Sequence, residues 1–258
     1  KNIKNYLRIQ IISKNSLIFS TEYKHLILDI YLMLPIALIY WPFLETFLRN
    51  NKKYILDKKY NKEELHKINS HFISGFHALS IIIFGCIYLV TQSSNVFYFI
   101  FFFSIVYFIY DSYSIWFNKI KEYYPYFIHH GASIYFLQCL LNYEGDVKNT
   151  MISGYILLEI TNLPSYYIYY YLKTNETKNE EYYKKLLNLK LGQLGLYGVL
   201  RLIVFGYLMK YCYKYICHQP VLTSCIVGLY IMGVYWSYKL IQGYLKTKED
   251  YKKIKINK

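Results

Sequence analysis

The chain has 258 residues, of which 55% are hydrophobic, and its formal net charge is +14. This length allows one domain or one helical bundle. The basic residues cluster between long apolar runs. A nucleic-acid-binding protein would instead interleave them with its structure on one face. The composition therefore argues against a nucleic-acid partner and indicates charged loops that flank membrane spans.

Seven apolar runs are long enough to cross a bilayer, which takes about 20 mostly apolar residues in a helix. The alternating pattern of strands is absent, so we expect an all-α integral membrane protein with seven transmembrane helices. Pro35 and Pro164 predict local kinks or breaks in the first and fifth spans. The predicted spans are 25–45, 69–91, 95–117, 126–143, 150–172, 191–211 and 221–244.

The distribution of Lys and Arg predicts the orientation. Loops on the side of the C-terminus, at 49–68, 118–125, 173–190 and from 246 onward, hold twenty of these residues, and the loops of the opposite side hold eight. The positive-inside rule therefore places the C-terminus in the cytosol and the N-terminus in the lumen or outside. The glycosylation sequon at Asn175 then lies on the cytosolic side, where we expect it to stay unused.

Six ionisable residues fall inside the predicted spans, where such groups are costly and indicate a functional site. With a rise of about 1.5 Å per residue, most of them lie in the cytosolic half of the membrane, with two near the middle. We expect them to share one cavity. No pair among the histidines and Asp111 has the i, i+4 spacing of a helical metal site, so we expect no metal. The six are His77, Asp111, His129, His130, Glu159 and Arg201.

Two interpretations of these residues remain open from the sequence alone. A neutral imidazole can act as a general base or a nucleophile, and a carboxylate on its other nitrogen fixes the tautomer. Adjacent helical residues point about 100° apart, so one of His129 and His130 is expected to face the cavity and the other to pack or bond to Asp111. The alternative is a structural network of His–Asp and Glu–Arg contacts that joins the helices.

Five stretches, taken in order, resemble the TLC domain. This family of multi-pass membrane proteins includes ceramide synthases, the translocon-associated TRAM proteins and small lipid-related members, and the pattern is most similar to the small members. The resemblance covers roughly residues 65–245 and implies a six-helix bundle around a lipid-shaped cavity, preceded by one extra span. The stretches are "SGFHALSIIIFGCIYL" (74–89), "YFIYDSYSIWF" (107–117), "HHGASIYF" (129–136), "LLEITNLP" (157–164) and "YWSYKLIQGYLK" (235–246).

The resemblance divides the chain into three parts. Residues 1–64 form an N-terminal tail, the first transmembrane helix and a basic cytosolic loop. Residues 65–245 form the TLC domain with six transmembrane helices, and residues 246–258 form a basic cytosolic tail. The family implies residence in the endoplasmic reticulum, with membrane lipids as partners.

The chain departs from the ceramide synthases at one motif. In those enzymes the two histidines belong to a longer pattern that continues as H-D-x-x-D, whereas Met151, Ile152 and Tyr155 stand at the corresponding positions here. The departure favours a protein that binds, senses or handles an acyl lipid and influences membrane lipid homeostasis.

Other functions remain open. A ceramide-synthase-like acyltransferase would use His129 or His130 with Asp111 as the orienting carboxylate, so whether the chain is an enzyme stays undecided. His77, Glu159 and Arg201 would bind a lipid head group in either case. A translocon or cargo-interaction protein is the weaker alternative. No cofactor is expected, and acyl-CoA enters only as the substrate of the acyltransferase.

Overall fold

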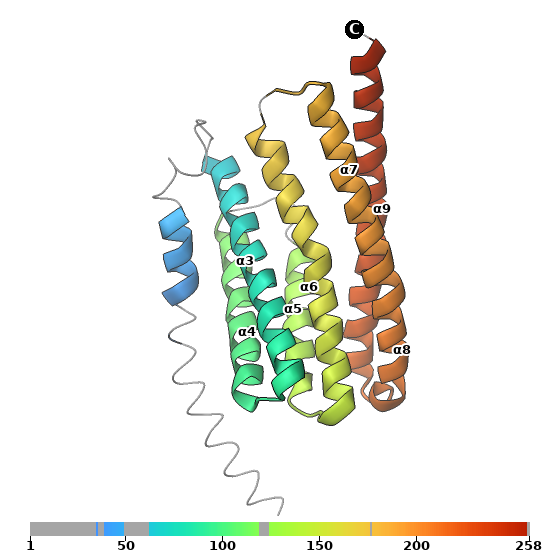
Figure 1. Ribbon diagram of the computed structural model, residues 1–258. Helices are drawn as coiled ribbons and strands as arrows, with labels where there is room; N and C mark the ends of the chain where they lie inside the picture. The colour runs from blue at the N-terminus through green and yellow to red at the C-terminus, as the bar shows by residue number, and fades with distance from the viewer. Residues whose placement is uncertain (1–34, 36–38, 49–61, 119–123, 176, 257–258) are drawn as a thin grey trace, which may run out of the picture.

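The computed structural model describes residues 35, 39–48, 62–118, 124–175 and 177–256. These residues form helices joined by short connections, and no strand occurs among them (Figure 1). From residue 62 onward the helices are α3 (Lys62–Thr91), α4 (Ser94–Phe117), α5 (Tyr124–Leu140), α6 (Gly145–Thr174), α7 (Glu180–Leu196), the π-helix η1 (Tyr197–Val204), α8 (Phe205–Ile216) and α9 (Pro220–Ile256).

The helices stand side by side in one bundle (Figure 1). Helix α3 packs against α4 and α6, α5 packs against α4 and α9, and α9 also packs along α7. Helices α7, η1 and α8 follow one another without a break from Glu180 to Ile216. Six of the seven predicted spans overlap helices of the structure, namely α3, α4, α5, α6, the continuous α7–α8 rod and α9. The first predicted span, 25–45, lies mostly outside the described residues.

The described chain has four helical segments that are long and apolar enough to cross a membrane. Two of them are α3 and α4, the third is the continuous α7–α8 rod, and the fourth is α9. Helices α5 and α6 lie in the same bundle but do not meet this criterion of length and apolarity. The chain is therefore a multi-pass membrane protein.

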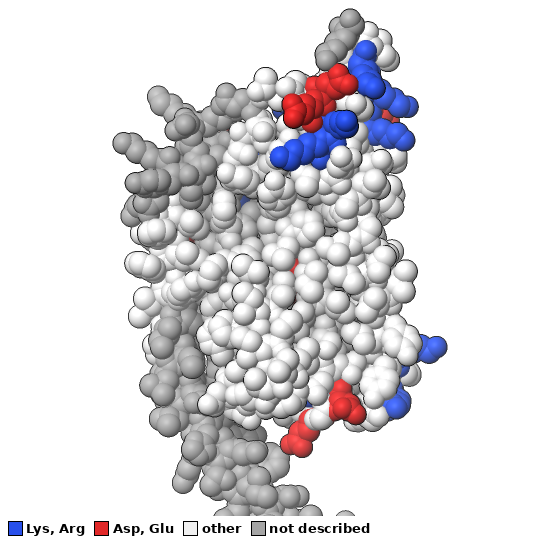
Figure 2. Space-filling view, in the orientation of Figure 1, with Lys and Arg blue, Asp and Glu red and all other residues white. Residues whose placement is uncertain are grey.

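Charged side chains gather at the two ends of the bundle, and a broad band of mostly uncharged surface separates them (Figure 2). Large apolar side chains on this outer surface, such as Ile109, Trp116 and Ile203, are exposed. Exposed apolar side chains around a helical bundle are expected where lipid takes the place of water.

Helix α6 runs through Pro164 without a break. Regular α-helix is instead interrupted in η1, which the sequence analysis did not predict. A π-helical turn inside a longer helix is rare and frequently lies at a functional site. Here the π-helix carries Tyr197 and Arg201, both buried.

A helical segment at 39–48 lies against α3 and α4. Trp41 is fully buried, with its ring centroid 4.7 Å from that of Phe103 and 5.2 Å from that of Tyr107. Glu45 lies in the same segment, and its carboxylate is 3.6 Å from Nδ1 of His66 on α3. This segment therefore covers the outer side of the α3–α4 pair.

Candidate functional site

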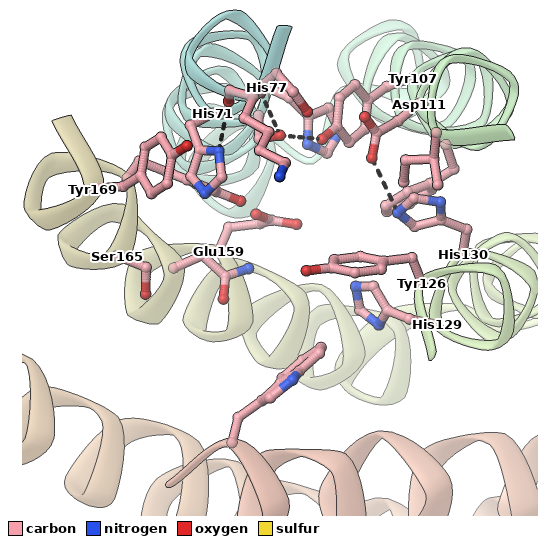
Figure 3. A pocket seen from close by; sticks show the side chains of 18 of the residues that line it. His71, His77, Tyr107, Asp111, Tyr126, His129, His130, Glu159, Ser165 and Tyr169 are labelled. Carbon is pink, nitrogen blue, oxygen red and sulfur yellow. Dashed lines mark hydrogen bonds and ion pairs between the residues drawn. The ribbon is translucent and has the colours of Figure 1, made fainter. Parts of the chain in front are cut away.

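A cavity of about 410 Å³ opens between α3, α4, α5, α6, η1 and α9 (Figure 3). It lies in the half of the bundle where α3 begins and where α4 and α6 end. Among the side chains that line it, only Phe108, Ile115 and Leu240 lack a polar atom. The polar atoms of these side chains can bind a polar group, and their aromatic rings and aliphatic stems also give the wall apolar surface.

Helix periodicity explains how α3 and α6 supply most of this lining. Residues three, four or seven positions apart share one face of a helix. That spacing is followed by Lys67, Ser70, His71, Ser74 and His77 on α3, and by Glu159, Asn162, Ser165, Tyr166 and Tyr169 on α6. The ring of His71 stacks on that of Tyr169, with centroids 3.8 Å apart, so the two faces meet at the mouth of the cavity.

The carboxylate of Asp111 contacts the imidazole of His130 on the α4–α5 side of the cavity (Figure 3). Oδ2 of Asp111 lies 3.4 Å from Nε2 of His130. The other ring nitrogen, Nδ1, lies 2.8 Å from the hydroxyl oxygen of Ser112. Both nitrogens of this buried imidazole are therefore engaged, and its orientation is fixed. The sequence analysis predicted that one of the two histidines would bond to Asp111, and the structure identifies it as His130.

His129 lines the same cavity but is held differently. Its ring meets the indole of Trp236 edge to face, with centroids 5.7 Å apart. Its Nδ1 atom is buried and has no hydrogen-bond partner within the described chain. A buried polar atom without a partner carries a free-energy cost that a bound ligand can remove. His129 is thus the histidine that is available to a ligand.

His77 stands at the closed end of the cavity. Its Nε2 lies 3.3 Å from Oγ of Ser104, and its ring stacks on Tyr107 with centroids 3.9 Å apart. The hydroxyl of Tyr155 donates to the same Ser104 oxygen at 3.0 Å. Beyond this layer the core is apolar and tightly buried, beginning with Met151.

Tyr155 occupies one of the positions where the resemblance places the missing acidic motif of the ceramide synthases. Its side chain is buried and binds Ser104, so the position helps to close the floor of the cavity. Met151 and Ile152 are fully buried in the core. Buried side chains of the core thus stand where the ceramide synthases have the H-D-x-x-D pattern, as the aligned residue types already indicated.

Glu159 and Arg201 lie on the opposite side of the cavity from Asp111. Glu159 lines the cavity, whereas Arg201 lies behind the lining and is only 1% exposed. One Arg201 nitrogen, Nη1, donates to Oδ1 of Asn162 at 3.1 Å and to Oγ1 of Thr161 at 3.3 Å. The structure therefore brings five of the six predicted residues to one cavity and places the sixth directly behind its wall.

The sequence analysis missed several lining residues. Tyr107 donates its hydroxyl proton to Ser74 at 2.8 Å and forms part of the wall. Trp236 lies between His129 and Arg201, since both contact its ring. Serine, tyrosine and tryptophan are ordinary in apolar helices, so only the spacing on α3 and α6 could have indicated them. Among the described residues, no three His, Cys, Asp or Glu side chains are grouped closely enough to hold a metal.

The family model of the TLC domain matches residues 67–242. The chain belongs to the TLC-domain family. The matched region begins in α3 and ends in α9, so it contains every residue that lines the cavity and leaves out the segment at 39–48. Neither the curated proteins nor the solved structures gave a match.

Proposed function

We propose that this TLC-domain protein binds a membrane acyl lipid, holds the polar part of it in the cavity and so influences membrane lipid composition. In this respect it would act like the small TLC-domain-containing proteins, in the endoplasmic reticulum, with the C-terminus in the cytosol. Under this orientation the cavity lies in the cytosolic half of the membrane, where it meets the head groups of the cytosolic leaflet.

The observation that carries the proposal is the polar lining of a cavity inside an apolar bundle. Polar side chains inside a membrane are costly and indicate a functional site, so their convergence on one cavity supports a bound polar group. The unpartnered Nδ1 of His129 supports the same conclusion. The outer surface of the helices is apolar, so the hydrocarbon part of a lipid can remain in the bilayer.

Photo-crosslinking tests this proposal. Cells that express the full chain would be fed a lipid precursor that carries a diazirine close to the head group, and the crosslinked peptides would be mapped by mass spectrometry. We expect labels on α3, α6 and α9 in the wild type. The variant Ile115→Trp fills the cavity and should abolish them, whereas Ile128→Trp changes an exposed Ile on α5 and should leave them in place. Equal labelling of both variants would show that the lipid does not enter the cavity.

The Asp111–His130 pair favours a second candidate, an acyl-CoA-dependent acyltransferase. A lipid amine would attack the thioester carbonyl while a histidine takes the proton from the amine nitrogen. The new carbon–nitrogen bond forms, the carbon–sulfur bond breaks, and coenzyme A leaves as the thiol with that proton. Asp111 would hold the imidazole in position and stabilise its protonated form.

Cells without their own ceramide synthases distinguish the two candidates. The wild type, His129→Ala and His130→Ala would be expressed at equal levels and supplied with labelled acyl-CoA and a sphingoid base. Product that is formed by the wild type and lost in either variant would establish an acyltransferase. Absence of product from folded wild-type protein would exclude ceramide synthesis and leave lipid binding.

A further inference from the structure

We propose that Tyr197, supported by Arg201, forms a subsite for the phosphate of a lipid head group on the η1 side of the cavity. The inference rests on the proposed function, because it names the chemical class of the lipid that the cavity takes. It is carried by the unpartnered hydroxyl of Tyr197, by cationic side chains at and behind the cavity wall, and by the π-helix that holds Tyr197 and Arg201.

The first observation concerns donors that have no acceptor. The hydroxyl of Tyr197 is buried without a hydrogen-bond partner in the described structure, and Tyr197 lines the cavity. Nε and Nη2 of Arg201 are also buried and without a partner there. The two Arg201 nitrogens lie behind the cavity wall, so the Tyr197 hydroxyl is the donor for which a ligand in the cavity can supply an acceptor oxygen.

The second observation is how Arg201 is placed. Its guanidinium lies 5.0 Å from the ring centroid of Tyr197 and 5.4 Å from that of Trp236. It therefore stacks behind two lining residues, while its Nη1 is fixed by Asn162 and Thr161. Arg201 holds Tyr197 in place and supplies positive charge, and the tyrosine hydroxyl makes the direct contact with the ligand.

The third observation is the balance of charge. Lys67 and Lys239 line the cavity, and Arg201 lies behind it. They face two carboxylates, those of Asp111 and Glu159. The positive charge of these three side chains at or behind the wall favours an anionic phosphate over a neutral head group.

The π-helix explains why both residues reach this position. Tyr197 and Arg201 are four residues apart, and in η1 both are buried among otherwise more exposed neighbours. A π-helical turn points its side chains in other directions than an α-helix would. Such turns are rare and are frequently found at functional sites. The irregularity of η1 thus has a use in the proposed subsite.

Binding to the purified full chain in a neutral maltoside detergent tests the inference. The probes are radiolabelled lysophosphatidate, monoacylglycerol of the same chain length, and inorganic phosphate. The variant Tyr197→Phe removes only the unpartnered hydroxyl. Its control is Tyr143→Phe, which removes another buried hydroxyl without a partner, on a residue that does not line the cavity.

We expect lysophosphatidate to bind the wild type and Tyr143→Phe equally, and Tyr197→Phe to bind it about tenfold more weakly, as for one hydrogen bond to a charged group. Monoacylglycerol should bind weakly to all three proteins. Equally tight monoacylglycerol binding would overturn the phosphate subsite but leave lipid binding intact. Binding of inorganic phosphate that is sensitive to Tyr197→Phe, without any lipid binding, would support the subsite chemistry and overturn the lipid as its source. Failure of all three probes to bind the folded wild type would overturn both proposals.

Discussion

His130 is held between a carboxylate and a hydroxyl that are neighbours on α4. Asp111 reaches Nε2 at 3.4 Å, and Ser112 reaches Nδ1 at 2.8 Å. The imidazole of α5 is thereby bonded to two successive residues of α4, whereas the adjacent His129 turns toward α9 and Trp236. Two neighbouring histidines thus have different surroundings, one fixed by protein partners and the other exposed to the cavity.

Asp111→Asn should destabilise the protein, because the amide keeps the size of the side chain but removes the negative charge beside His130. We expect the free energy of unfolding to fall by about 1–3 kcal/mol, measured by thermal unfolding in detergent. Glu144→Gln, at an exposed position before α6, serves as the control and should change little. Equal stability of both variants would show that the contact between Asp111 and His130 contributes nothing to the stability of the fold.

Gly85→Ala should weaken the contact between α3 and α6. A Cβ atom at this position would lie 2.6 Å from Cγ1 and 2.7 Å from Cδ1 of Ile156, so the Ile156 side chain or one of the two helices must shift. We expect a loss of about 1–3 kcal/mol in the free energy of unfolding. Gly192→Ala on α7, where a Cβ meets open space, should instead stabilise by up to about 1 kcal/mol through helix propensity.

The double variant Gly85→Ala with Ile156→Ala tests the cause of that loss. Ile156→Ala removes both clashing atoms, so the double variant should be more stable than the sum of the two single losses predicts. Additive losses would mean that the clash is relieved elsewhere and that Gly85 has no specific role in this helix contact.

Gly233→Leu should displace Arg201. A Cβ at this position would already be in contact with Arg201, 3.4 Å from Nε and 3.5 Å from Cγ, and the larger leucine side chain would extend beyond it. We expect a loss of at least about 1–3 kcal/mol in the free energy of unfolding. Gly228→Leu on the same helix meets open space and provides the matched control. If the two variants melt at the same temperature, Arg201 is not confined as the structure indicates.

The positions of the helices could be predicted from the sequence because lipid imposes a simple rule of length and apolarity. Six predicted spans overlap described helices, including α5 and α6, which are not among the four helices that are long and apolar enough to cross a membrane. The convergence of Asp111 and His130 also followed from the sequence, since a short connection between two antiparallel helices brings their facing ends together.

Other features depend on details that composition does not determine. The π-helix arises from hydrogen-bond geometry within one rod, and no residue type in Tyr197–Val204 requires it. The buried position of Arg201 behind Tyr197 and Trp236 depends on how the side chains of α6, η1 and α9 pack together. Glu45 and His66 were missed because both lie close to the ends of predicted spans, where charged residues are usual.

Labelling of Cys217 tests the predicted orientation. This exposed cysteine lies in the short connection between α8 and α9, at the end of the bundle opposite to the start of α3. In a variant whose other four cysteines are serine, a membrane-impermeant maleimide should label Cys217 only after the lumenal side of sealed microsomes is opened. Labelling of sealed microsomes, whose cytosolic face is outside, would contradict the orientation, as would a glycan on Asn175.

Trp41→Ala should affect the cavity from outside the TLC domain. Trp41 does not line the cavity, but it packs against Tyr107, which in turn stacks on His77 at the cavity floor. Truncation should lower the free energy of unfolding by about 3–5 kcal/mol, as for a buried aromatic residue. Phe43→Ala, at an exposed position in the same segment, should cost much less and is the control.

The photo-crosslinking assay separates two roles of Trp41. If the segment at 39–48 holds Tyr107 and His77 in place, Trp41→Phe should restore both the stability and the crosslinking of the lipid at α3, because an aromatic ring again fills the space beside Tyr107. Crosslinking that is normal in a destabilised Trp41→Ala protein would limit the segment to a structural role. Loss of crosslinking in Trp41→Ala that Trp41→Phe reverses would show that a helix outside the TLC domain supports the wall of its cavity from behind.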